Sequence, residues 1–237
     1  MLNAGFVFPV AALALGILTS AYFLIEWWRA HRRPRFLLLW AVALFLMYWF
    51  QVPTILTGPG KVITVTDFNL FFALTLPITF VALVLVYIGS LEVVGSRLKG
   101  RTRTWFLCWF LFAVIFFAYH FIMRKGVIET HTLPFVGNVA FYLPIRMLIL
   151  FIFVRWLSGP TPKGAYGVLG AAAVIGEGVI GIFRNFLVLK TILVYPPQFW
   201  YVALTSSKAF FLLQTLSIIL LALGFYLLYR MHQRLRS

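Results

Sequence analysis

Seven long apolar segments make up most of the sequence and limit what this chain can fold into. Each can cross the hydrocarbon core of a bilayer as a helix, because about 20 residues at roughly 1.5 Å per residue span about 30 Å. A helix also pairs its own backbone polar groups, which lipid requires. The segments are 6–28, 36–57, 68–90, 104–123, 135–156, 165–189 and 199–229. The sequence therefore predicts an all-α, polytopic integral membrane protein: a single domain over 1–237 that forms a seven-helix transmembrane bundle.

Composition supports lipid as the solvent of this chain. Apolar residues make up 63% and charged residues 11%, which is too few polar groups to cover the surface of a soluble domain. The net charge of +15 is carried mostly by short loops, which suits anionic lipid headgroups better than nucleic acid. We therefore expect membrane lipids as partners and no nucleic acid. A single cysteine, Cys108, excludes a multi-cysteine metal site, and no histidines have ligand spacing, so no metal is expected.

The loops between the segments differ in their content of basic residues. The larger basic set consists of the loops after the first, third and fifth segments and the C-terminal tail. It contains Arg29, Arg32, Arg33, Arg35, Arg97, Lys99, Arg101, Arg103, Arg155, Lys163, Arg230, Arg234 and Arg236. The loops after the second, fourth and sixth segments contain only Lys61, Arg124, Lys125 and Lys190. Cytoplasmic loops are the ones rich in Lys and Arg. This asymmetry predicts a multi-pass protein of the plasma membrane with its N-terminus outside and its C-terminus in the cytoplasm.

Ionisable residues inside the predicted spans are candidates for function, because a charge in the membrane is costly. Arg146 lies near the middle of the fifth span, two residues after Pro144, where the helix is expected to kink. Glu177 lies near the middle of the sixth span, at a similar depth. We therefore predict an Arg146–Glu177 ion pair. It is either a structural strut that holds two helices in register or part of a gate or ligand site.

One face of the sixth span combines small and charged residues at helical spacing. Its members are Gly170, Ala173, Glu177, Gly181 and Arg184. Small residues let a neighbouring helix approach closely, so this face is expected to point into the bundle. Gly176 and Gly178 flank the acid and are expected to loosen the helix there, because glycine has weak helix propensity.

The outer half of the bundle is expected to collect more cations than acids. Arg146, Arg184, Lys208 and His120 are predicted at this depth, with Glu177 below them. Such a pocket would attract a carboxylate, a phosphate or a lipid headgroup. Alternatively, Arg184 and Lys208 only extend their long side chains to the outer interface.

The seven-helix plan resembles that of the microbial opsins. Thr205-Ser206-Ser207-Lys208 is similar to the stretch around the retinal lysine of that family, and the polar, proline-containing stretch 69–77 resembles its third span. This resemblance implies retinal bound to Lys208 as a Schiff base. The third-span carboxylate that serves as counterion in that family is missing here, since 68–91 contains no acid. No other cofactor is expected. The outline also resembles the seven-helix membrane regions of bacterial sensor proteins.

Three function classes follow from these features. The first is a non-enzymatic membrane sensor or accessory subunit that binds a small anionic or lipid-like ligand through Arg146, Glu177, Arg184, Lys208 and His120. Because only eight residues follow Tyr229, it would need a partner protein in the membrane or cytoplasm. The second is a proton-coupled transporter with a broken helix at Glu177. The third is a lipid-processing enzyme with Glu177 or His120 as base, for which the sequence contains no catalytic motif.

Overall fold

The computed structural model describes residues 4–30, 34–48, 65–123, 131–160, 164–196, 203–204 and 207–234, and these residues are almost entirely helical. The long helices are α1 (Ala4–Arg29), α4 (Val65–Val93), α5 (Gly100–Met123), α9 (Gly164–Val194) and α11 (Lys208–Arg234), and α2 (Arg35–Met47) is shorter. A continuous run consists of α7 (Thr132–Val136), the π-helix η2 (Gly137–Tyr142) and α8 (Leu143–Ser158). Six of these stretches are long and apolar enough to cross a membrane. The all-α prediction is confirmed.

The expected spans agree with these helices to different degrees. The helices α4 and α9 extend beyond the predicted segments at both ends, because helical structure continues past the apolar window. The second span was expected to reach residue 57, but α2 ends at Met47 and the rest of that span lies outside the described residues. Much of 199–206 also lies outside the described residues, so α11 is described only from Lys208 onward.

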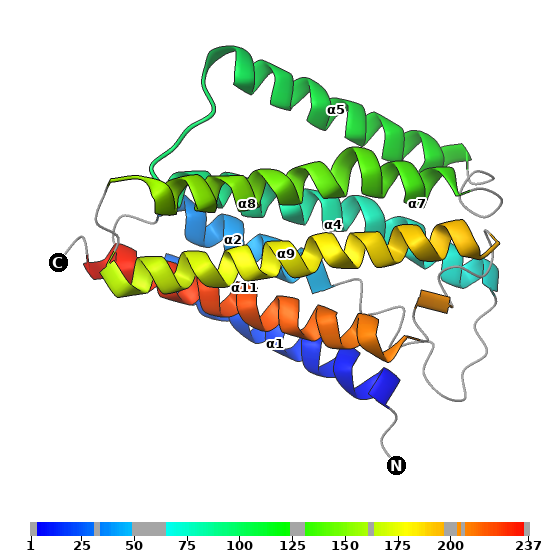
Figure 1. Cartoon of the computed structure of the whole chain (residues 1–237), viewed down its shortest axis with the longest axis horizontal. Helices are drawn as coiled ribbons and strands as arrows, with labels where there is room; N and C mark the ends of the chain where they lie inside the picture. Colours follow the sequence, from blue (N-terminus) through cyan, green and yellow to red (C-terminus); the bar gives the residue numbers. More distant parts are fainter. Residues whose placement is uncertain are drawn as a thin grey trace.

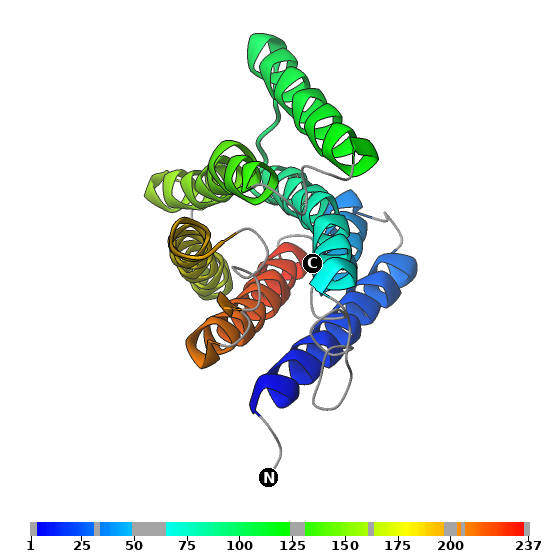
Figure 2. The same cartoon turned by 90° about the vertical axis from the view of Figure 1, so that its right-hand side faces the viewer.

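Consecutive helices run in opposite directions, so the chain crosses the bundle back and forth (Figure 1). The ends of α1, α4, α8 and α11 therefore lie near the starts of α2, α5 and α9. The end-on view shows α5 at the edge of the bundle, beside α4 and α8 (Figure 2). This alternation brings the described members of the larger basic set to one end and Lys190 to the other. Which end faces the cytoplasm stays a prediction.

Two glycines allow α9 and α11 to pack closely. A Cβ added to Gly170 would lie 2.9 Å from Cγ of Leu228 and 3.0 Å from the backbone nitrogen of Leu228. A Cβ added to Gly224 would lie 2.7 Å from Cγ2 of Val174. Gly170, Ala173, Glu177 and Gly181 are all buried, which confirms that this face of the sixth span points into the bundle.

We predict that Gly170→Ala destabilises the protein by about 1–3 kcal/mol, because backbone atoms of α11 have no room to move away from the new methyl group. Gly176→Ala is the matched control in the same helix. Its Cβ would meet Leu220 at 3.4 Å, an ordinary contact, and alanine has the higher helix propensity. Unfolding of the purified protein in detergent measures both changes. Equal stability of the two variants would contradict the proposed packing.

Candidate functional site

A buried ion pair joins α8 to α9. Nη1 of Arg146 donates a hydrogen bond to Oε1 of Glu177 over 2.8 Å, and the two residues are 6% and 3% exposed. Ser217 of α11 donates a second bond, also 2.8 Å long, to the same carboxylate oxygen. The predicted Arg146–Glu177 pair is confirmed. Because Ser217 also binds the acid, the contact connects three helices rather than two.

Gly181 makes room for this pair. A Cβ at Gly181 would collide with Nη1 of Arg146, so only glycine lets the guanidinium lie against α9 one turn from Glu177. A similar relation holds between Gly16 of α1 and the ring of Tyr48, the residue that follows α2. From the sequence, Gly181 is expected to be a helix-contact residue. Its position shows that it accommodates the charged side chain.

The helix that carries Arg146 contains a π-helical turn, Gly137–Tyr142, just before Pro144. Proline has no N–H to donate, and the expected disturbance of the helix is seen as this wider turn on its N-terminal side. Nδ2 of Asn138 donates a 2.7 Å bond to the carbonyl oxygen of Pro134, one turn earlier. The hydroxyl of Tyr142 donates to the carbonyl oxygen of Leu76 on α4. These bonds fix the segment that leads into Arg146.

A cavity of about 80 Å³, with both polar and apolar lining residues, lies beside the ion pair. It is lined by the end of α2, the first half of α4, η2 and α8, the second half of α9 and the first half of α11. A buried water needs roughly 10–15 Å³ on this measure. The cavity therefore has room for several waters or for one compact polar molecule.

Six buried polar atoms, all on residues that line the cavity, have no hydrogen-bond partner in the described structure. They are the hydroxyls of Tyr48 and Thr79, Nε of Arg146, Nε of Arg184, Nδ2 of Asn185 and Oε1 of Gln214. All except the Gln214 oxygen can donate a hydrogen bond. A buried polar group without a partner costs about 1–3 kcal/mol, so the cavity is suited to an occupant that accepts hydrogen bonds.

The charge of the cavity is positive. Arg146 and Arg184 both line it, and Glu177 is the acid paired with Arg146. Arg184 makes no ion pair with any carboxylate in the described part of the chain, and its guanidinium lies 5.2 Å from the centre of the Phe210 ring. An anion is therefore the occupant that would best compensate this charge in a low-dielectric interior.

The structure brings together only part of the predicted site. Arg146, Glu177 and Arg184 meet at the cavity, whereas the His120 ring lies on α5 at 4.5 Å from the Phe116 ring and does not line it. The side chain of Lys208 lies outside the described residues. The expected loosening of the sixth helix is wrong: α9 is continuous from Gly164 to Val194 because α8 and α11 support it on both sides of Glu177.

Several residues of the cavity were not predicted from the sequence. In the sequence, Gln214 and Ser217 are ordinary interhelical hydrogen-bonding residues of an apolar span, and Tyr48, Thr79 and Asn185 carry no signal. An uncharged polar residue in an apolar helix is common, so its role becomes visible only when several meet. Among the described residues, no three His, Cys, Asp or Glu side chains gather where a metal ion could bind.

Comparisons with known proteins do not assign a family: no family model, no curated protein and no solved structure matches this chain. The resemblance to microbial opsins stays a prediction.

The pair itself can be tested with Arg146→Met, Glu177→Met and the double variant. Arg146→Met leaves the Glu177 carboxylate buried without its partner, and Glu177→Met does the same to the Arg146 guanidinium. Each single change should therefore lower the free energy of unfolding by about 3–5 kcal/mol. The double variant removes both charges and should lose less than the sum of the single losses. Denaturation in detergent micelles measures all three. Additive losses would show that the two side chains do not interact.

Proposed function

We propose that this multi-pass membrane protein binds a small anion, with a carboxylate or phosphate group, in the cavity beside Arg146 and Arg184. The observation that carries the proposal is the set of unpartnered hydrogen-bond donors around a cavity that also carries excess positive charge. Unpartnered donors and excess positive charge are features of a binding site, so we assign the protein to the sensor or accessory-subunit class.

The donors favour an oxyanion over a neutral molecule or water alone. Nε of Arg146 and Nε of Arg184 are both free to donate, and guanidinium groups bind carboxylate and phosphate oxygens in a fixed geometry. Nδ2 of Asn185 and the hydroxyl of Tyr48 add neutral donors from α9 and from the end of α2. Water would satisfy these donors but would leave the extra charge uncompensated.

The volume of about 80 Å³ limits what the cavity can enclose. A compact carboxylate or a phosphate group fits this space, whereas a lipid-like ligand would place only its acidic group here. The apolar part of such a ligand would lie elsewhere.

Glu177 is the carboxylate that binds Arg146 when no anion is in the cavity. Its carboxylate already binds Arg146 through Nη1, so an incoming anion competes with an internal acid for the same guanidinium. Binding would weaken the contact that connects α8, α9 and α11, and this change could be passed to a partner protein. We propose that this exchange is how occupancy of the cavity is communicated.

Transport of the anion is the second candidate. It is favoured by the π-helical turn Gly137–Tyr142, because irregular helical turns are frequent at functional sites and both Asn138 and Tyr142 line the cavity. Uptake of acetate or phosphate into proteoliposomes under a pH gradient separates the two candidates. A sensor binds the anion without moving it, and a proton-coupled transporter accumulates it.

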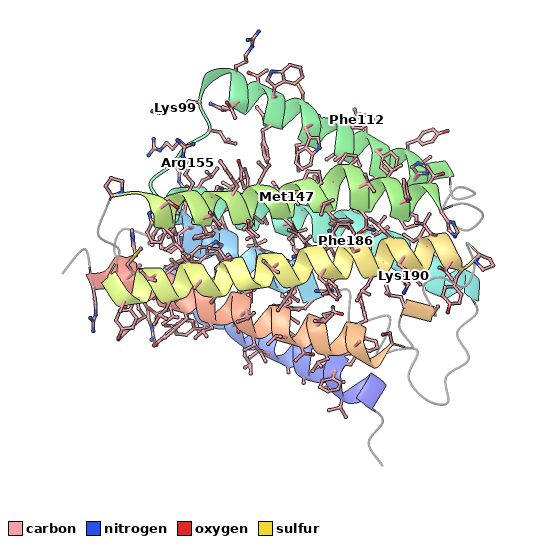
Figure 3. All side chains as sticks on the ribbon, in the orientation of Figure 1. Lys99, Phe112, Met147, Arg155, Phe186 and Lys190 are labelled. Atoms are coloured by element: carbon pink, nitrogen blue, oxygen red, sulfur yellow. The ribbon has the colours of Figure 1, made fainter. Side chains whose placement is uncertain are left out.

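We predict that acetate or inorganic phosphate binds the purified protein saturably and that Arg184→Gln weakens binding by at least about tenfold, since a charge-assisted contact is lost. Lys190→Gln is the matched control: it removes the same charge from the same helix, at an exposed position near the end of α9 (Figure 3). Calorimetry at constant ionic strength measures both. If neither anion binds, or if the two variants behave alike, the proposal is wrong.

Replacing Glu177 should raise the affinity for the anion rather than lower it. Glu177→Gln keeps an acceptor for Ser217 but removes the internal acid that competes for Arg146, so the anion should bind more tightly by about fivefold, or about 1 kcal/mol. The same titration measures this change, with the unfolding temperature as a check that the variant is folded. Weaker binding in a folded variant would contradict the role given to Glu177.

A further inference from the structure

A second, larger hollow lies at the opposite end of the bundle from the cavity. It has a volume of about 930 Å³ and lies between the end of α4, the start of α5, the start of α2 and the end of α11. We call it the basic groove. In both views α5 diverges from α8 toward this end, so the groove opens where α5 begins (Figure 1, Figure 2).

The chain turn that forms the groove is fixed by Gly95. Its φ of 70° lies in the left-handed region, which glycine adopts without strain, and the backbone nitrogen of Ser96 donates a 2.8 Å bond to the carbonyl oxygen of Leu91. This Schellman-type cap ends α4 and sends the chain across to α5. Arg97 in the connection and Arg103 in the first turn of α5 therefore line the same groove.

Three arginines and one acid surround the groove. Arg35 comes from the start of α2 and joins Arg97 and Arg103, while Glu92 at the end of α4 is the acid that lines it. All four side chains are exposed, and none forms an ion pair with another described residue. Three arginines against one carboxylate leave the groove with an excess of positive charge.

The inner wall of the groove is apolar and continues into the membrane-crossing helices. It includes Ile88 and Leu91 of α4 and Phe106 and Leu107 of α5. These residues belong to the apolar stretches Leu74–Val93 and Gly100–His120. The groove thus combines cations at the end of the spans with an apolar surface that runs toward the bilayer core.

The helix α5 is held to the bundle further along its length. Nε1 of Trp109 donates a 3.0 Å bond to the carbonyl oxygen of Ala140 in η2. The Phe117 ring lies 5.9 Å from the Phe80 ring of α4 and 5.5 Å from the Phe141 ring of η2. This anchoring leaves the first turns of α5 apart from α8.

From these features we propose that the basic groove binds an anionic phospholipid. The phosphate lies among Arg35, Arg97 and Arg103, and an acyl chain follows the wall formed by Ile88 and Leu107. Basic pockets between membrane helices hold acidic lipid headgroups at the cytoplasmic face, which is where the loop charges predict this end to lie. A soluble anion would use the arginines but leave the adjoining apolar wall uncovered.

The test counts bound lipids on the detergent-purified protein by native mass spectrometry, with phosphatidylglycerol and phosphatidylcholine of the same chain length. The wild type should bind phosphatidylglycerol in preference. Arg97→Gln with Arg103→Gln should weaken that binding by roughly 30-fold, because each basic residue near an anionic headgroup changes affinity about fivefold. Glu92→Gln should strengthen it, because it removes the one acid from the groove.

The matched control is Arg101→Gln with Arg155→Gln. It removes the same charge at the same end of the bundle, but neither residue lines the groove (Figure 3 shows Arg155). Arg101 is two positions before Arg103, so the two do not share a helix face. A loss below about threefold in the control supports a defined site. Equal losses in both pairs would show only general attraction to the basic surface and would overturn the proposal.

Glycerol 1-phosphate distinguishes a lipid from a free phosphate. At millimolar concentration it should not displace phosphatidylglycerol, because it lacks the acyl chains that cover the apolar wall. Displacement at a concentration similar to that of the lipid would overturn the lipid assignment. Neither result depends on the cavity at the other end, since none of these variants touches Arg146, Glu177 or Arg184.

Discussion

Arg146 of α8 and Glu177 of α9 face each other at 2.8 Å in the interior of a bundle whose side chains are mostly apolar. Neither charge tolerates this environment alone, so the helices must keep the register in which the two meet. Ser217 extends the requirement to α11, and Gly181 leaves the space that the guanidinium occupies. The cavity lies beside this contact, because Arg146 and Ser217, which both bind the acid, also line the cavity.

The two proposed sites use arginine in different ways. In the cavity, Arg146 and Arg184 are held among helices, so an anion would meet donors that are already ordered and would lose little freedom on binding. In the basic groove, Arg35, Arg97 and Arg103 are exposed at the end of the spans, where a lipid headgroup is abundant and need not be bound tightly. The first arrangement suits a specific ligand, and the second suits a constituent of the bilayer.

The sequence was sufficient for six helices long enough to cross a membrane, for the Arg146–Glu177 pair and for the inward face of α9, because each follows from apolar length or from the cost of a buried charge. It was insufficient for Tyr48 and Asn185, because uncharged polar residues are tolerated in any span and only the tertiary packing brings them together. His120 was misplaced for the same reason: its position on the fourth apolar segment was predictable, but the position of the helix formed there, α5, at the edge of the bundle was not.

An ion pair requires that Glu177 be an ionised carboxylate beside Arg146 inside the bundle. Infrared difference spectroscopy of the wild type against Glu177→Gln tests this directly, because a protonated acid and a carboxylate absorb in separate regions. The structure predicts that the substitution removes a carboxylate band at neutral pH. Loss of a protonated carboxylic acid band instead would show that Glu177 is neutral and that the ion pair does not exist.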